Sequence, residues 1–172
     1  MTSLPCLVVM GVSGAGKSTV GAELADALGV PFVDADDLHP LTNVEKMRAG
    51  VALDDDDRWP WLDAVGQAIA AAETTGVVVA CSALRASYRE AIRVRAPHAR
   101  FVMLHADREL LLERLRSRAG HFMPASLLDS QLATLEPLGP SEHGITVDAA
   151  SAPEVITAEV AAYVASTPTP TP

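Results

Sequence analysis

Cysteines are scarce in this chain of 172 residues, which contains only Cys6 and Cys81. Each lies within or at the end of an apolar run, and the spacing shows no cluster of zinc ligands around either. We therefore expect two buried thiols on core strands, and not a disulfide or a metal-binding pair.

Basic residues are fewer than acidic ones, and long hydrophobic runs are lacking. Lys and Arg number 13 against 22 Asp and Glu, for a formal net charge of −9. Surfaces that bind nucleic acid need clustered cations, so this balance argues against a nucleic-acid partner.

No apolar stretch approaches the roughly 20 residues of a membrane span, and the N-terminal residues show neither a charged region nor a cleavage signature. We expect no membrane segment and a cytoplasmic location.

Hydrophobic residues make up 49% of the chain, which suits one globular domain over residues 1–165. Residues 166–172 form a Thr/Pro tail, which we predict to be disordered. Strand and helix patterns alternate, which predicts an α/β fold with a parallel sheet and helices on both faces. The predicted strands are 4–10, 31–34, 76–81, 101–105 and 144–147. The predicted helices are 17–28, 60–74, 85–95, 107–118, 124–134 and 153–165, and a short helix begins near Thr42.

The most informative segment is a complete G-x-x-x-x-G-K-S loop between the first strand and the first helix. In that context the loop's backbone N–H groups and the helix N-terminus surround phosphate oxygens. We expect Lys17 to reach the β- and γ-phosphates of a nucleoside triphosphate, and the Ser18 hydroxyl to bind Mg²⁺. The predicted nucleotide-binding residues are Gly11, Val12, Ser13, Gly14, Ala15, Gly16, Lys17, Ser18 and Thr19.

Two carboxylates, Asp34 and Asp36, close the second predicted strand. The phosphate-binding loop opens from the same edge of the sheet, where ligands of open parallel sheets bind. One carboxylate is a candidate to approach Mg²⁺ through water, and the other is a candidate for orienting an attacking hydroxyl and accepting its proton. Of the two, Asp34 is taken as the metal-binding residue. The alternative is that both are turn or cap residues.

Residues 36–58 and about 118–124 depart from the simple alternation, and such segments suit a second substrate and a mobile lid. The first ends in Asp54–Asp57 followed by Arg58, which fits either a clamp for an anionic substrate or a plain salt bridge. Before the second, Arg114, Arg116 and Arg118 fit either a lid that stabilises the transferred phosphoryl group or a solvent-facing basic helix end.

Two absences narrow the class of nucleotide-binding protein. The third strand ends in Cys81-Ser82-Ala83-Leu84-Arg85 and lacks the aspartate that many P-loop ATPases and switch GTPases carry there. An Asn-Lys-x-Asp guanine-reading motif is also missing. Both absences argue against a motor or a GTPase.

Four stretches resemble a known family: GVSGAGKSTV (11–20), DADDLHPLTNVEKMRAGVALDDDDRWPWL (34–62), CSALRASYR (81–89) and GHFMPASLLDSQLATLEPL (120–138). They resemble the P-loop small-metabolite kinases related to adenylate and shikimate kinases, and within that group the chain is most similar to gluconokinase. The resemblance implies a three-layer P-loop kinase fold with a five-stranded parallel sheet and a lid.

The resemblance also implies ATP-dependent phosphorylation of the 6-hydroxyl group of D-gluconate, with ATP and Mg²⁺ as cofactors, and a homodimer. By analogy, Asp36 would hold or deprotonate that hydroxyl, and Arg118 would be a lid cation. His39, Arg58, Arg85 and His121 would bind the substrate. The family usually has Lys at the position of Arg85, and a guanidinium is not equivalent to an ammonium group.

Two other functions stay open. One is a kinase for shikimate, a nucleoside monophosphate or another small metabolite. The other is an ATP-binding module without transfer activity, although such a module would not need Asp36 together with a lid arginine.

Overall fold

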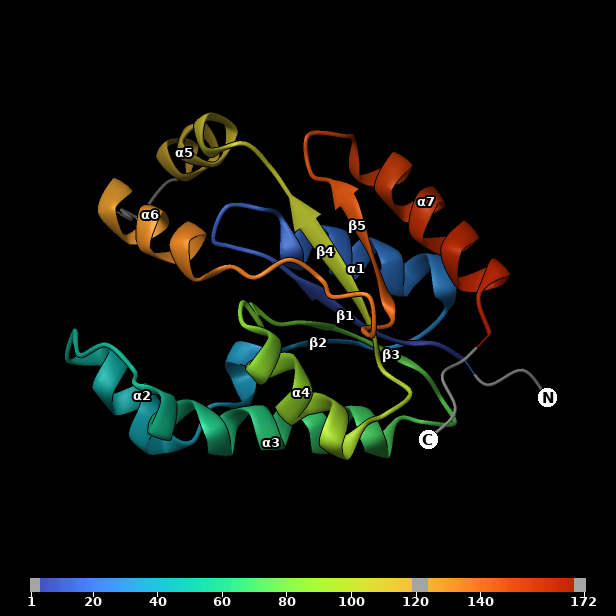
Figure 1. Cartoon of the computed structure of the whole chain (residues 1–172), viewed down its shortest axis with the longest axis horizontal. Helices are drawn as coiled ribbons and strands as arrows, with labels where there is room; N and C mark the ends of the chain where they lie inside the picture. Colours follow the sequence, from blue (N-terminus) through green and yellow to red (C-terminus); the bar gives the residue numbers. More distant parts are fainter. Residues whose placement is uncertain (1–3, 119–123, 169–172) are drawn as a thin grey trace.

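The computed structural model describes residues 4–118 and 124–168. Five parallel strands form one sheet in the order β2-β3-β1-β4-β5. Figure 1 shows this sheet between two layers of helices. The strands are β1 (Cys6–Met10), β2 (Phe32–Asp34), β3 (Val77–Ala80), β4 (Arg100–His105) and β5 (Gly144–Asp148). The predicted strands are confirmed to within two residues at each end.

The helices divide between the two faces of the sheet. They are α1 (Lys17–Leu28), α2 (Leu41–Arg48), α3 (Asp55–Ala71), α4 (Ala86–Arg95), α5 (Arg108–Ser117), α6 (Ala125–Thr134) and α7 (Pro153–Ser166), with a 3₁₀ turn η1 (Ala35–Leu38). Alternate residues of a strand point to opposite faces, so Leu7 and Val9 join one core with α1, α5, α6 and α7. Cys6 and Val8 join a second core with α3 and α4.

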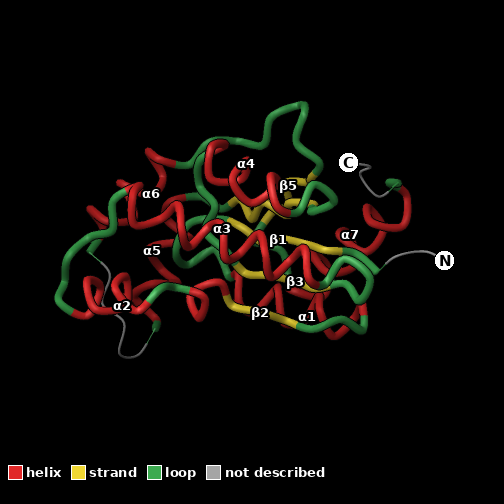
Figure 2. Tube along the Cα trace, turned by 90° about the horizontal axis from the view of Figure 1, so that it is seen from below, coloured by secondary structure: helices red, strands yellow, loops and turns green. Residues whose placement is uncertain are grey.

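Both views of the chain place α2, α5 and α6 at one end of the molecule (Figures 1 and 2). In Figure 1 the carboxyl end of β4 points toward α5. The loops that follow β1, β2 and β3 open toward the same end. The arrangement therefore gathers the predicted functional segments at one edge of the sheet.

Helix α3 begins at Asp55, five residues before the predicted start, because Asp54 caps it. The Asp54 carboxylate accepts from the Asp57 N–H at 2.9 Å, and the Asp57 carboxylate accepts from the Asp54 N–H at 3.1 Å. This reciprocal pair forms a capping box, and the helix dipole favours the remaining aspartates of the first turn. The predicted segment 36–58 thus contains η1, α2 and the first turn of α3.

At the C-terminal end of the predicted domain, Ser166 is the last residue of α7, although it was predicted as the first residue of the tail. Residues 169–172 of that tail lie outside the described residues. Over the described parts of the chain, no helix is long and apolar enough to cross a membrane.

Candidate active site

The loop between β1 and α1 has the backbone that phosphate binding requires. Gly14 and Gly16 have φ values of +83° and +96°, a region that favours glycine. Gly16 also caps the N-terminus of α1, so the unpaired N–H groups of the first turn face the loop. The Lys17 ammonium group folds back over the loop and donates to the Val12 carbonyl at 3.1 Å. Burial lowers the pKa of Lys17.

A cavity of about 380 Å³ opens beside this loop. It brings together predicted site residues from three segments: the phosphate-binding loop, the end of β2 and the end of α5. The end of β3 and α6 contribute lining residues that were not predicted as site residues. Its lining is Ser13, Gly14, Gly16, Lys17, Ser18, Asp34, Asp36, Ala80, Cys81, Ser82, Arg118 and Gln131. The expectation that Cys6 and Cys81 are buried free thiols is confirmed.

Ser18 and Asp34, the two predicted magnesium ligands, meet at this cavity. The Ser18 hydroxyl donates to Asp34 Oδ2 at 3.3 Å, and Asp34 Oδ1 accepts from the Asp36 N–H at 3.0 Å as the cap of η1. Asp34 therefore has the capping role that was the alternative, while its other oxygen faces Ser18. Neighbouring oxygens on one octahedral Mg²⁺ lie about 3 Å apart, so this pair fits the ion. Groups of three or more His, Cys, Asp or Glu suited to a metal are absent from the described part of the chain.

Asp36 reaches into the cavity from η1, and its side chain is 86% exposed. Partial desolvation, followed by the nearby Asp34 carboxylate, raises the pKa of Asp36, while His39 and Lys17 oppose the shift. Behind it, His39 Nε2 lies 4.0 Å from Asp36 Oδ1. The His39 side chain is only 4% exposed. His39 therefore contacts the candidate catalytic carboxylate and is not an open wall of the cavity.

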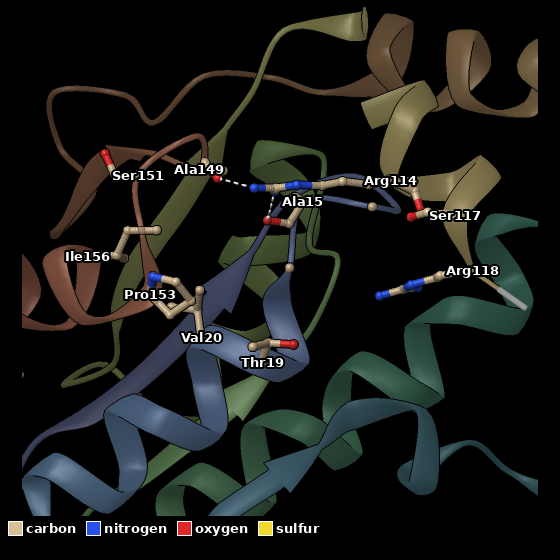
Figure 3. A pocket seen from close by; sticks show the side chains of 12 residues that line it. Ala15, Thr19, Val20, Arg114, Ser117, Arg118, Ala149, Ser151, Pro153 and Ile156 are labelled. Atoms are coloured by element: carbon tan, nitrogen blue, oxygen red, sulfur yellow. Dashed lines mark hydrogen bonds between the residues drawn. The ribbon is translucent and has the colours of Figure 1, made fainter. Parts of the chain in front are cut away.

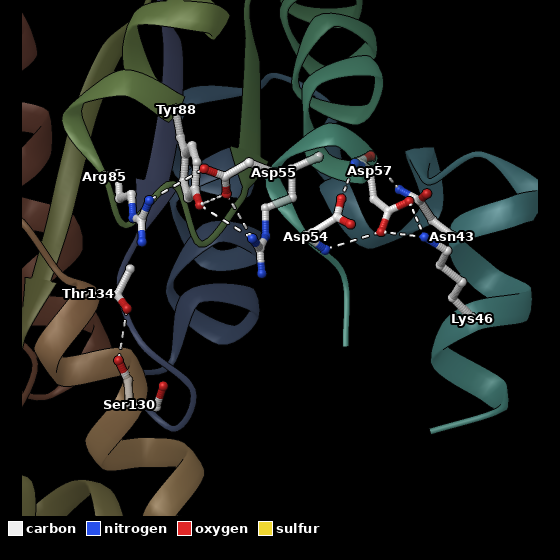
Figure 4. A network of polar contacts seen from close by, with 10 residues as sticks. Asn43, Lys46, Asp54, Asp55, Asp57, Arg85, Tyr88, Ser130 and Thr134 are labelled. Atoms are coloured by element: carbon white, nitrogen blue, oxygen red, sulfur yellow. Dashed lines mark hydrogen bonds and ion pairs between the residues drawn. The ribbon is translucent and has the colours of Figure 1, made fainter. Parts of the chain in front are cut away.

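Arg58 and Arg85 do not belong to that cavity lining. Both form ion pairs with Asp55, and Figure 4 shows Arg85 and Tyr88 beside Asp55. Asp55 Oδ1 accepts from Arg58 Nη1 at 3.0 Å, and Asp55 Oδ2 accepts from Arg85 Nη1 at 3.4 Å. The Tyr88 hydroxyl donates to Asp55 Oδ1 at 2.6 Å, and its ring lies 5.8 and 5.6 Å from the two guanidinium carbons. That hydrogen bond is the main reason why the pKa of Asp55 is lowered. Arg58 is thus in a salt bridge with Asp55, and its use as a clamp for an anionic substrate stays a prediction.

A second cavity, of about 290 Å³, adjoins the other side of the phosphate-binding loop (Figure 3). Thr19 and Val20 come from α1, and Pro153 and Ile156 from α7. Arg114 spans its upper edge and donates to the carbonyls of Ala15 and Ala149 at 3.3 and 2.6 Å. Its mostly small and apolar lining next to the phosphate loop suits the nucleoside part of ATP.

The predicted lid is only partly described. Arg118 is the C-cap of α5 with an extended backbone and an exposed side chain, so it no longer follows the helical face of Arg114. His121 lies outside the described residues, as do all of residues 119–123 between Arg118 and Pro124.

Sequence reasoning missed Gln131, Asp55 and Tyr88. Gln131 Oε1, on α6, accepts from the Ser13 N–H of the phosphate loop at 2.7 Å. Gln131 belongs to the 120–138 stretch that carries the family resemblance, and this membership was the only signal for it. Asp55 is one of four consecutive aspartates, and nothing in that run marks which one reaches the arginines.

The fold and the cavity together define a P-loop kinase of the shikimate kinase class. The family model for shikimate kinase matches residues 13–161. A shikimate kinase from Acinetobacter baumannii in complex with shikimate has the same fold, with a TM-score of 0.59 at 20% identity over 95% of this chain and 94% of that one.

Proteins with higher sequence identity to this chain identify its family within that class. Gluconokinase of Gluconobacter oxydans is 48% identical over 90% of this chain and 88% of its own. A probable gluconokinase of Xenopus tropicalis is 44% identical over 90% of each chain. The crystal structure of a gluconokinase from Sinorhizobium meliloti superposes with a TM-score of 0.85 at 48% identity, over 96% of this chain and 94% of that one. The chain belongs to the gluconokinase family.

Proposed function

We propose that this protein transfers the γ-phosphoryl group of ATP to the 6-hydroxyl group of D-gluconate and releases 6-phospho-D-gluconate and ADP. The observation that carries the proposal is the single cavity that holds Lys17, Ser18, Asp34 and Asp36 in a chain 48% identical to a gluconokinase over most of its length. Of the other readings, a kinase for shikimate is supported by the family model over residues 13–161 and by a shikimate kinase structure of the same fold at 20% identity. A kinase for a nucleoside monophosphate or another small metabolite has only the phosphate-binding loop in its favour.

In this mechanism the protein positions two substrates and stabilises charge. Asp36 orients the gluconate hydroxyl; as the hydroxyl oxygen bonds to the γ-phosphorus and the bond to ADP breaks, Asp36 accepts the proton. Lys17 and Arg118 stabilise the charge on the transferred group. Ser18 and Asp34 hold Mg²⁺, which neutralises phosphate charge when bound.

Arg58 and Arg85 supply the recognition of the gluconate carboxylate. A protein with a net charge of −9 repels an anionic substrate unless cations are concentrated where that substrate binds. Two guanidinium groups that share one aspartate leave a net positive charge of one for the carboxylate. His121 is proposed as a further substrate contact, and residues about 118–124 as a lid that excludes water.

We propose that the protein is a homodimer, as the resemblance to the family implies, and sedimentation would test this directly. We also propose that it acts in the cytoplasm, where ATP and Mg²⁺ are available.

A panel of acceptors in an assay that couples ADP release to a colour change tests the function. We expect ADP release with D-gluconate and much slower release with other sugar acids, shikimate or nucleoside monophosphates. Turnover with shikimate alone would replace the proposed substrate. ATP hydrolysis that no acceptor changes would favour an ATP-binding module without transfer activity.

A further inference from the structure

The imidazole ring of His39 is held in one orientation between α2 and α3. It stacks on the indole ring of Trp61, with centroids 4.3 Å apart and planes inclined by 12°. Trp61 is itself fixed, because its Nε1–H donates to the Ala35 carbonyl at 2.7 Å. Stacking of this kind holds the ring in one plane. The contact between His39 Nδ1 and the Asn43 amide at 3.2 Å then distinguishes this orientation from the one turned by 180° within that plane.

Asn43, on α2, then determines which ring nitrogen of His39 carries the proton. Asn43 is only 2% exposed, and its side-chain Nδ2 donates to the Asp57 carbonyl at 2.9 Å. Because a carbonyl only accepts, this contact identifies the amide nitrogen. The same nitrogen lies 3.2 Å from His39 Nδ1. An amide N–H₂ group only donates, so Nδ1 must accept, and the proton of the neutral ring is on Nε2.

The Nε2–H of His39 therefore faces the cavity side of the ring, toward Asp36. Nε2 lies 4.0 Å from Asp36 Oδ1. A hydrogen bond needs a separation of about 3 Å, so the exposed Asp36 side chain has to move about 1 Å closer for Nε2–H to donate to it. Burial lowers the pKa of His39, which favours the neutral ring that this arrangement needs. A carboxylate that accepts on one oxygen from a fixed donor presents the other oxygen in one direction.

We propose that Asn43 is a positioning residue for phosphoryl transfer: it holds His39 in the Nε2–H tautomer, so that His39 aims the Asp36 carboxylate at the acceptor hydroxyl. The inference rests on the proposed role of Asp36. It assigns no substrate contact to Asn43 or His39; both act through Asp36.

The tautomer is measurable in the unaltered protein, without any substrate. Ring ¹⁵N chemical shifts and long-range ¹H–¹⁵N couplings of His39 distinguish a protonated Nε2 from a protonated Nδ1. We expect the Nε2–H form at neutral pH. A protonated Nδ1, or a doubly protonated ring at that pH, would overturn the proposal whatever the substrate of the enzyme proves to be.

Kinetics of paired variants then test the consequence. Asn43→Leu removes the donor, and we expect kcat to fall by about 10- to 100-fold, as for other residues that orient a functional side chain, with KM for ATP and gluconate within about 3-fold. In His39→Gln the amide N–H₂ takes the place of Nε2–H, and kcat should stay within about 10-fold of the wild type. Adding Asn43→Leu to His39→Gln should then lower kcat little further, because glutamine has no ring tautomer for Asn43 to set.

Lys46→Met is the matched structural control. Lys46 also joins α2 to α3, through Asp57 at 2.6 and 2.8 Å, but does not touch His39. We expect its kcat to stay near that of the wild type. Equal losses in Lys46→Met and Asn43→Leu, or an undiminished loss when Asn43→Leu is added to His39→Gln, would assign Asn43 a merely structural role. A wild-type protein inactive on gluconate would overturn the proposed function, and the tautomer would still be tested by its ¹⁵N shifts.

Discussion

Arg89 and Glu142 form a buried ion pair in which the guanidinium Nε lies 2.6 Å from the carboxylate Oε1. The Arg89 side chain is fully buried and that of Glu142 is 8% exposed. The same guanidinium group also donates to four backbone carbonyls, those of Ala83, Leu84, Glu136 and Pro137. The pair therefore ties the loop after β3, which leads to Arg85, to the segment between α6 and β5.

Removing the carboxylate should destabilise the fold strongly. Glu142→Ala leaves a buried guanidinium without its counter-charge, and we expect the free energy of unfolding to fall by about 3–5 kcal/mol. Chemical denaturation measures this. Glu90→Ala is the control, since Glu90 pairs with Arg93 at the surface and such pairs contribute about 1 kcal/mol or less. Similar losses in the two variants would contradict the importance of the buried pair.

The same carboxylate should make stability depend on pH. Desolvation raises the pKa of Glu142, but the hydrogen bonds from Arg89 and the Gly139 N–H, together with the positive charges of Arg89 and Arg93, outweigh it, so the pKa lies below its ordinary value of 4.5. A lowered pKa in the folded state contributes stability that is present above the unfolded value and is lost as the pH falls through the folded value. In Glu142→Gln the group cannot titrate. We expect the stability gap between wild type and Glu142→Gln to shrink on acidification from about pH 6 to about pH 3; a constant gap would be inconsistent with this linkage.

The sequence predicts which residues form the site better than it predicts the contacts between them. Lys17, Ser18, Asp34 and Asp36 could be placed together because a P-loop and an Asp-x-Asp motif each follow a parallel strand, and the carboxyl ends of such strands share one edge. The Asp55–Tyr88 contact depends on how α3 packs against α4, 33 residues further on. The Gln131–Ser13 contact spans 118 residues. No local pattern encodes either packing, and for the same reason the burial of His39 against Trp61 was not foreseen.

Loss of the P-loop lysine should stop turnover without unfolding the protein. In Lys17→Ala the cation that stabilises the transferred phosphoryl group is gone, and we expect kcat to fall by about 100-fold or more. The coupled ADP-release assay measures the rate, and thermal unfolding checks that the variant is folded. A near-wild-type rate would remove Lys17 from the proposed mechanism.

Substitutions around Asp55 should affect gluconate and not ATP. Arg58→Ala removes a charge-assisted partner for the substrate carboxylate, and we expect KM for gluconate to rise by about 10- to 100-fold. KM for ATP should change little, because the phosphate cavity is lined by other residues. Arg85→Lys keeps the charge and should raise KM for gluconate only a few-fold. If Arg58→Ala raises both KM values equally, Arg58 acts through the fold and not through the substrate.

The two cysteines should be inert in the folded protein. Burial raises the pKa of the Cys6 thiol to about 11 and that of the Cys81 thiol to about 12. The thiolate is the reactive form, so at pH 8 about one Cys6 thiol in a thousand is reactive, and fewer at Cys81. Iodoacetamide at pH 8 should therefore leave the native protein unmodified and add two carbamidomethyl groups after denaturation, as counted by intact mass. Cys81 lines the phosphate cavity, so it is the stricter test of the two: rapid alkylation of native Cys81 would mean that the cavity floor opens to solvent far more than the structure shows.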